Sequence, residues 1–167
     1  MNLYILRHAI AIERGTPGYE NDAERPLTPK GERKLGRIAR AMRRLDLELD
    51  LVLTSPYVRA RQTAERVVEV LKLEKRMEFT DTLIPGGDST ALVNLISSHP
   101  QAPENVLLVG HEPYLSGLVS LLVAGAEGFV VELKKGGLCK LTVDQLKHGR
   151  CAELSWLLTP KQMELMA

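Results

Sequence analysis

The feature that most constrains the fold is an alternation of short apolar runs with longer amphipathic segments. The runs at residues 2–6, 51–54 and 106–109 are rich in strand formers and are typical of strands buried in a parallel sheet. The segments between them repeat apolar residues every three or four positions, as Leu35 and Ile38 do, which predicts helices. The sequence therefore predicts an α/β fold.

Further elements continue this alternation. Residues 77–80 predict another strand and residues 89–98 another helix. The runs at residues 138–143 and 152–158 predict a hairpin-like pair of strands across a polar turn that contains Gly149. This order of elements favours a three-layer α/β/α sandwich with a mostly parallel sheet.

Three prolines indicate where helices are expected to begin. Each follows a residue that is able to cap a helix: Thr28-Pro29, Ser55-Pro56 and, less conventionally, Glu112-Pro113. Proline is favoured at the first helical position, directly after the N-cap residue. The longest irregular segment, residues 13–26, is interpreted either as a cover for a site or as a surface loop with no role.

Length and composition restrict the class of protein. With 167 residues the chain supports one substantial core, so residues 1–167 are expected to form a single domain. Its 22 basic and 21 acidic residues give a net charge of +1, which argues against nucleic acid binding. Polar residues and glycines interrupt the apolar stretch at residues 114–133, so no membrane span is expected. We interpret Cys139 and Cys151 as buried thiols of a cytoplasmic protein.

Cationic and nucleophilic side chains follow three of the predicted strands. Arg7 and His8 follow the first strand, Arg59 comes shortly after the second, and His111 follows the third. Ligands bind at the carboxyl ends of the strands in an open α/β sheet, so these side chains are expected to meet there. The arginine forks match phosphate oxygens, and a helix that begins at Ser55 would add backbone N–H groups. The predicted occupant is a phosphate group.

Histidine is suited to attack phosphorus, because neutral imidazole, with a pKa of about 6.5, is unprotonated and nucleophilic near neutral pH. His8 is the candidate nucleophile, and His111 is placed to stabilise charge on the transferring phosphoryl oxygens. Metal binding is the competing interpretation of the two histidines. Neither has an HxH or HExxH partner, and the flanking arginines would repel a divalent cation. We therefore expect neither a metal nor a cofactor.

Four segments resemble motifs of the histidine phosphatase superfamily. They are Leu6-Arg7-His8-Ala9, Leu27-Thr28-Pro29-Lys30-Gly31, Ser55-Pro56-Tyr57-Val58-Arg59-Ala60-Arg61-Gln62-Thr63-Ala64 and Gly110-His111-Glu112-Pro113. Their order and separations match the family over nearly the whole chain. The resemblance implies a phosphoglycerate mutase-like fold in which His8 is the phosphorylated nucleophile. It also implies that Arg7 and Arg59 hold the phosphate and that His111 is the second histidine of the pocket.

Within this superfamily, the short chain, the Arg7-His8-Ala9 form and residues 83–88 look most like the SixA-type phosphohistidine phosphatases. That resemblance implies a phosphorylated protein as substrate, such as a histidine-containing phosphotransfer domain, and a role in signal transduction. Larger members of the superfamily use a glutamate as general acid, which has no assigned counterpart here. Asp81 and Asp88 are nearby candidates, although Asp88 is also placed to cap a helix and Asp81 to end a strand.

The residues leave three functions open. The leading hypothesis is removal of phosphate from protein phosphohistidine through a covalent intermediate on His8, and the runner-up is a phosphatase for small phosphate esters. The third is a module that binds phosphorylated partners without turnover, whose sequence mark would be loss of His8. Basic side chains line the helix predicted after Thr28 and form either a docking face for an acidic protein domain or a solvated face: Lys30, Arg33, Lys34, Arg37, Arg40, Arg43 and Arg44.

Overall fold

The computed structural model describes residues 1–126 and 128–167, and its sheet has six strands in the order β3-β2-β4-β1-β5-β6. The strands are β1 (Asn2–Arg7), β2 (Leu51–Thr54), β3 (Met77–Phe79), β4 (Asn105–Gly110), β5 (Leu138–Val143) and β6 (Ala152–Leu158). The pairs β1–β4, β4–β2 and β2–β3 are parallel, and the pairs β1–β5 and β5–β6 are antiparallel. The predicted mostly parallel sheet and terminal hairpin-like pair are confirmed.

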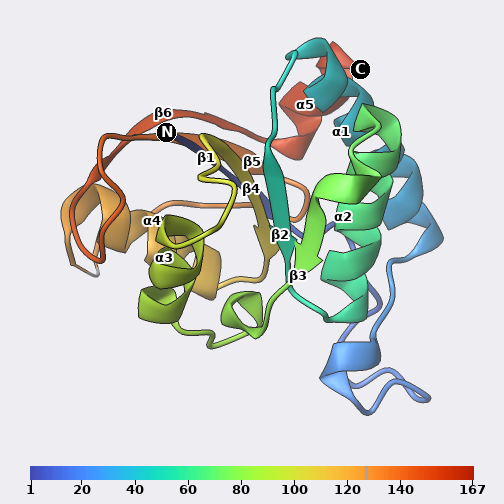
Figure 1. Ribbon diagram of the computed structural model, residues 1–167. Helices are drawn as coiled ribbons and strands as arrows, with labels where there is room; N and C mark the ends of the chain where they lie inside the picture. Colours follow the sequence, from blue (N-terminus) through green and yellow to red (C-terminus); the bar gives the residue numbers. More distant parts are fainter. Residues whose placement is uncertain (127) are drawn as a thin grey trace.

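Helices cover both faces of this sheet. They are α1 (Pro29–Arg44), α2 (Val58–Leu71), α3 (Ser89–Ser97), α4 (Tyr114–Ala124) and α5 (Pro160–Met166), with short 3-10 helices η1 (Asp22–Glu24), η2 (Glu74–Arg76) and η3 (Asp81–Leu83). In Figure 1, α1, α2 and α5 lie on one side of the sheet and α3 and α4 on the other. The buried side chains separate in the same way, with Leu35 and Val67 in one cluster and Leu92 and Leu118 in the other. The three-layer arrangement is as predicted.

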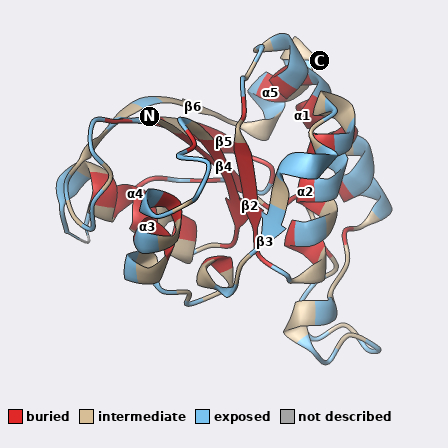
Figure 2. Cartoon of the chain, in the orientation of Figure 1, coloured by how far each residue is buried: buried red, intermediate tan, exposed pale blue. Residues whose placement is uncertain are grey.

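The central strands are the most deeply buried part of the chain (Figure 2). Every residue of β2 is buried, as is every residue of β4 after Asn105. A strand that is covered on both faces has no polar side, which explains why these segments read as continuous apolar runs. The edge strand β6 instead consists of half-buried and exposed residues.

The start of α1 agrees with the sequence, whereas the start of α2 does not. Thr28 caps α1, because its hydroxyl accepts the N–H of Gly31 at 3.0 Å and Pro29 follows as the first helical residue. We expected α2 to begin at Ser55-Pro56, but it begins at Val58. Ser55 continues the pairing of the sheet, with its N–H donating to the Val109 carbonyl at 3.0 Å. A residue held in that way belongs to the strand end and not to the helix.

The start of α4 also differs by one residue from the expectation. Pro113 occupies the N-cap position, and the first helical residue is Tyr114. The carboxylate of Glu112 accepts the N–H of Ser116 at 2.9 Å. Glu112 thus satisfies one of the free N–H groups in the first turn, which is the purpose of a cap.

The helix α1 approaches the segment after β1 very closely. A Cβ atom added to Gly31 would lie 2.1 Å from the carbonyl oxygen of Ile10, so only glycine fits. The N–H of Thr28 donates to the same Ile10 carbonyl at 2.9 Å, and Ala11 pairs with Leu27 in an isolated bridge. These contacts hold the segment that follows His8 against the amino end of α1.

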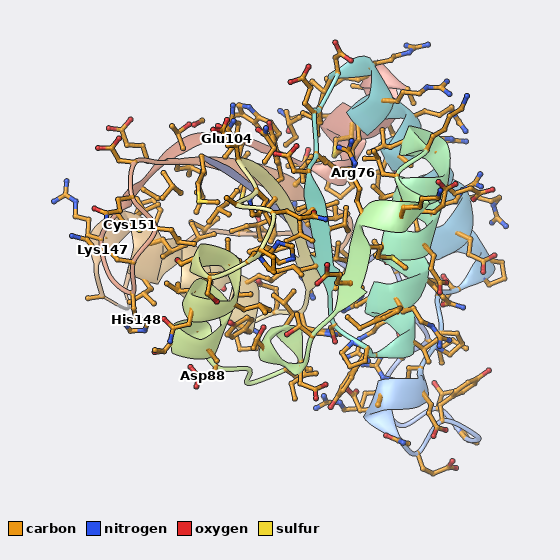
Figure 3. All side chains as sticks on the ribbon, viewed as in Figure 1. Arg76, Asp88, Glu104, Lys147, His148 and Cys151 are labelled. Atoms are coloured by element: carbon orange, nitrogen blue, oxygen red, sulfur yellow. The ribbon has the colours of Figure 1, made fainter. Side chains whose placement is uncertain are left out.

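The two cysteines differ in burial. Cys139 is buried in β5, whereas Cys151 is half-buried and lies near Lys147 at the periphery of the molecule (Figure 3). The prediction of two buried thiols is therefore wrong for Cys151, because that residue precedes the edge strand β6. None of the helices formed by the described residues is long and apolar enough to cross a membrane.

Candidate active site

The order of the strands places the predicted site residues next to one another at the carboxyl ends of the strands. Strand β4 lies between β1 and β2, so the residues that follow these three strands are neighbours. The N–H of His8 donates to the Gly110 carbonyl at 3.0 Å, and the rings of His8 and His111 have centroids 5.1 Å apart. The expectation that these segments meet at the carboxyl ends of the strands is confirmed.

The side chain of His8 is buried and oriented by the backbone. Its Nδ1 atom lies 2.7 Å from the carbonyl oxygen of Ala9, so Nδ1 carries the proton that this contact requires. In the neutral ring the lone pair is then on Nε2, which accepts a hydrogen bond from Nε of Arg59 at 3.3 Å. Burial lowers the pKa of His8 well below its usual value, and nearby positive charges lower it further against the opposing Ala9 carbonyl. His8 is therefore a neutral imidazole at physiological pH.

His111 is oriented by Ser55 in a comparable way. Its Nε2 atom lies 2.9 Å from Oγ of Ser55, and this oxygen accepts the N–H of Tyr57 at 3.3 Å. The Ser55 hydroxyl is thus free to donate to Nε2, which leaves the proton of the neutral ring on Nδ1. Among the residues that the structure describes, buried Nδ1 has no hydrogen-bond partner. Burial, followed by the charge of Arg59, lowers the pKa of His111 to about 3.

Arg59 is held by a residue that the sequence did not single out. Its Nη1 donates to the Asp22 carbonyl at 2.6 Å and its Nη2 to Oδ2 of Asp22 at 2.9 Å. The side chain of Arg59 is only 3% exposed, so this pairing offsets the cost of burying its charge. The segment at residues 13–26 therefore contacts the candidate site through Asp22.

Asp22 is also paired with a second arginine. Nη2 of Arg25 lies 2.8 Å from Oδ1 of Asp22. Partial burial alone would raise the pKa of Asp22, but hydrogen bonds from Arg25 and Arg59 lower that pKa well below its usual range. Asp22 is consequently ionised at every pH at which the protein is expected to work.

Arg7 lies at the other side of the site. Its Nη1 donates to the Leu133 carbonyl at 2.9 Å, while its buried Nε has no hydrogen-bond partner among the described residues. Burial lowers the pKa of Arg7, and the charge of Glu112 opposes that effect. The positive charge of Arg7 lowers the pKa of both His8 and His111, as expected for a group beside both rings.

Thr63 connects α2 to the backbone next to His8. Its Oγ1 atom donates to the Arg59 carbonyl at 2.6 Å and accepts the N–H of Ala9 at 3.0 Å. Thr63 was not predicted as a site residue, although it lies one helical turn after Arg59 and is buried. That spacing is a signal that sequence reasoning could have used.

The two aspartates that were candidates for the general acid are both exposed and lie at the starts of helices α3 and η3. Asp88 is exposed and caps α3, with its Oδ1 accepting the N–H groups of Thr90 and Ala91 at 2.8 and 3.1 Å. The cap predicted for Asp88 is confirmed. Asp81 is exposed at the start of η3. Figure 3 shows His148 on the same side of the molecule as Asp88, and His148 contacts Ser89 at 3.2 Å.

The arrangement is suited to a tetrahedral oxyanion. Two neutral imidazoles lie among the charges of Arg7 and Arg59, and Nε of Arg7 and Nδ1 of His111 are buried donors without a protein partner among the described residues. A phosphoryl oxygen is an acceptor for both kinds of donor. In the described part of the chain, no group of three or more histidine, cysteine, aspartate or glutamate residues is arranged to hold a metal ion.

Comparison with known proteins identifies the family. The family model of the histidine phosphatase superfamily (branch 1) matches residues 3–84, which include Arg7, His8 and Arg59. An uncharacterised protein of Picosynechococcus is 36% identical over 142 residues, which cover 84% of each chain. The phosphohistidine phosphatase SixA of Escherichia coli is 29% identical over 99% of this chain and 98% of its own. The chain belongs to the histidine phosphatase superfamily.

Solved structures agree with this assignment. The protein histidine phosphatase SixA complexed with tungstate has a TM-score of 0.83 and is 27% identical over 98% of this chain and 99% of its own. This member of the superfamily is therefore a phosphatase, and it is similar to SixA in both sequence and structure. The α-ribazole phosphatase of Shigella flexneri, with a TM-score of 0.64 and 20% identity over 96% of this chain and 97% of its own, shares the fold.

Proposed function

We propose that this member of the superfamily removes phosphate from phosphohistidine in proteins, with His8 as the nucleophile. The observation that supports this proposal most is the hydrogen bond between Nδ1 of His8 and the Ala9 carbonyl at 2.7 Å. It leaves the lone pair on Nε2, at the position where Arg59 and His111 converge. A neutral, oriented imidazole in a cationic pocket is what attack on a phosphoryl group requires.

The proposed reaction has two steps. In the first step, Nε2 of His8 forms a bond to phosphorus while the P–N bond of the substrate breaks, and the bonding electron pair leaves with the substrate imidazole. In the second step, water attacks the phosphorus of phospho-His8 and loses a proton to solvent, while the P–Nε2 bond breaks and its electron pair returns to Nε2. Inorganic phosphate leaves, and His8 returns to its neutral form.

The other site residues are proposed to act on the phosphoryl oxygens. Arg7 and Arg59 bind them as charged donors, and the Nδ1–H of His111 donates to the charge that accumulates as the phosphoryl group passes to His8. Because burial keeps the pKa of His111 at about 3, this histidine acts as a neutral donor and is not the source of a proton for the leaving group.

The preference for phosphohistidine follows from the leaving group. An alkoxide leaves slowly unless an acid protonates it, a contribution of about 10² to 10⁴-fold. Imidazole needs less help, since its second nitrogen can already carry a proton near neutral pH, and cleavage of the P–N bond then releases a neutral ring. With Asp88 engaged as a helix cap, an exposed Asp81 is the remaining candidate acid from the sequence.

Two of the similar proteins bear on this choice. SixA of Escherichia coli is named a phosphohistidine phosphatase, and the solved SixA structure holds tungstate, a tetrahedral oxyanion like phosphate. The second candidate is a phosphatase for small phosphate esters, which the shared fold with the α-ribazole phosphatase favours. For the first candidate, a histidine-containing phosphotransfer domain is the proposed type of protein substrate.

The deciding experiment compares substrates on one preparation of the purified protein. We expect kcat/KM to be highest for a phosphohistidine protein, lower for an aryl phosphate and much lower for an alkyl phosphate, because ester leaving groups depend on an acid. An alkyl phosphate that equals the phosphohistidine protein would support the small-ester function instead. In that case Asp81→Asn and Asp88→Asn would show which carboxyl group supplies the proton.

A further inference from the structure

A groove of about 590 Å³ opens directly beside the candidate active site. Arg7 and Ala9 line it, so it continues from the place where the phosphoryl group is proposed to bind. Its other walls come from α1, from the segment before β5 and from the beginning of α5. Figure 1 shows α5 beside α1, and the ion pair of Lys34 with Glu164 at 3.0 Å joins these two helices.

The groove concentrates positive charge that the chain as a whole does not have. Five cationic side chains line it: Arg7, Lys34, Lys134, Lys135 and Lys161. The lining has one carboxylate, Glu132, so its net charge is +4, compared with +1 for the whole chain. Lys34 and Lys134 are paired with acidic residues at 3.0 and 3.7 Å. Lys135 and Lys161 are exposed and have no ion pair with any described residue.

The lining of the groove combines apolar and cationic side chains. Ile10, Ile38 and Pro160 contribute the apolar lining. Lysine is a flexible, strongly hydrated point charge, unlike the rigid fork of arginine. A groove lined by lysines is therefore adapted to a broad acidic surface with varied geometry. A single small anion would be fixed better by arginine forks and backbone N–H groups.

We propose that this lysine groove, formed around Arg7, Lys34, Lys134, Lys135 and Lys161, docks an acidic segment of the phosphorylated protein substrate. The carboxylates of that segment lie at the lysines, and its apolar side chains contact Ile10 and Ile38. This inference rests on the proposed phosphohistidine phosphatase function, because the docked segment adjoins the phosphorylated residue. Complementary charge accelerates association and selects among partners.

The test uses two peptides that differ only in charge. Each carries one phosphohistidine, flanked by glutamates in one peptide and by glutamines in the other. At low ionic strength we expect kcat/KM to be about tenfold higher for the glutamate peptide, as is usual for electrostatic steering, and added salt should reduce that preference by screening. In the double variant Lys135→Glu with Lys161→Glu, the preference should disappear or reverse.

The matched control is Lys75→Glu. Lys75 is an exposed lysine of η2, and it is not among the residues that line the groove. This variant should keep the full preference for the glutamate peptide. Equal kcat/KM for both peptides in the wild type, or an undiminished preference in the double variant, would overturn the docking proposal.

A binding measurement separates this proposal from the proposed function. Fluorescence anisotropy with unphosphorylated versions of both peptides reports on the groove without any turnover. If the protein hydrolyses neither phosphohistidine peptide, the proposed function fails, while tighter binding of the unphosphorylated glutamate peptide that is lost in the double variant still supports an acidic-segment groove. If anisotropy shows no difference between the two peptides, the groove proposal fails even when hydrolysis is observed.

Discussion

The carboxylate of Asp22 lies 2.9 Å from Nη2 of Arg59, and the Asp22 carbonyl lies 2.6 Å from Nη1 of the same side chain. One loop residue thus engages both terminal nitrogens of a guanidinium whose Nε faces His8. A phosphoryl group bound between Arg59 and His8 would share this guanidinium with a permanent negative charge. The position of the loop at residues 13–26 is therefore coupled to anion binding.

We predict that Asp22→Asn tightens inhibition by inorganic phosphate by about tenfold, because it removes one negative charge near the anion. The amide keeps the size of the side chain, and the backbone contact to Nη1 remains. The inhibition constant against an aryl phosphate gives the measurement, with Glu24→Gln in the same 3-10 helix as control. Weaker inhibition would mean that Asp22 acts chiefly by holding Arg59 in place.

Replacement of the proposed nucleophile gives a second prediction. His8→Ala should abolish turnover and keep the fold, because the side chain follows the end of β1 and belongs to neither apolar core cluster. Wild-type protein quenched during turnover of a labelled substrate should carry acid-labile phosphate on His8. The control is His148→Ala, an exposed histidine. Comparable turnover by His8→Ala, with circular dichroism showing a folded protein, would exclude covalent catalysis by this residue.

Arg59→Lys tests the guanidinium geometry. Lysine keeps the positive charge but cannot contact His8 and both acceptors on Asp22 at once. We expect vanadate to bind at least about tenfold more weakly to this variant, in line with the loss of a charge-assisted hydrogen bond. Arg61→Lys, an exposed change in the same helix, should leave vanadate binding as in the wild type. Wild-type affinity in Arg59→Lys would show that charge alone is sufficient.

His111→Ala should lower kcat by about 10² to 10³-fold, the usual effect of removing one donor to a transition-state charge, and should change KM much less. Ser55→Ala should have a smaller effect in the same direction, because it removes only the hydroxyl that orients Nε2 of His111. Steady-state kinetics with an aryl phosphate separates the two parameters. A large rise in KM with kcat retained would indicate ground-state binding.

Stability should fall on acidification because of the buried histidines. The pKa of His111 is about 3 in the folded protein and about 6.5 in an unfolded chain, so below pH 6.5 the unfolded state binds the additional proton. The free energy of unfolding should therefore decrease as the pH falls from 7 toward 4. Urea titrations at several pH values measure the slope, and it should be shallower in His111→Gln. An identical slope in that variant would contradict a neutral His111.

Much of the fold followed from periodicity. The runs at residues 51–54, 138–143 and 152–158 form strands with those bounds. Burial of a strand on one or both faces requires apolar residues at regular positions, so the sequence alone indicates where such strands lie. The meeting of His8 with His111 also followed, since strand ends in such a sheet converge. The helix expected at Ser55 was wrong, because the Ser55 hydroxyl contacts His111 and its N–H continues the sheet.

Asp22 could not have been found in this way. It lies in an irregular segment where no repeat relates one position to another, and an acidic residue in a polar loop is usually solvated. Its contact with Arg59 depends on how residues 13–26 fold back toward α2, which is a property of the tertiary structure alone. Cys151 illustrates the same difficulty, because its exposure depends on the edge position of β6.

The hydroxyl of Thr63 bridges the Arg59 carbonyl and the Ala9 N–H, and so ties a helix to the backbone that also orients the His8 ring. If α2 slides along the sheet in a thermal fluctuation, this bridge carries the backbone beside His8 along with it. The two hydrogen bonds therefore oppose a change in the distance between the His8 ring and the guanidinium. One hydroxyl thus links the positions of the two groups that are proposed to contact the same phosphoryl group.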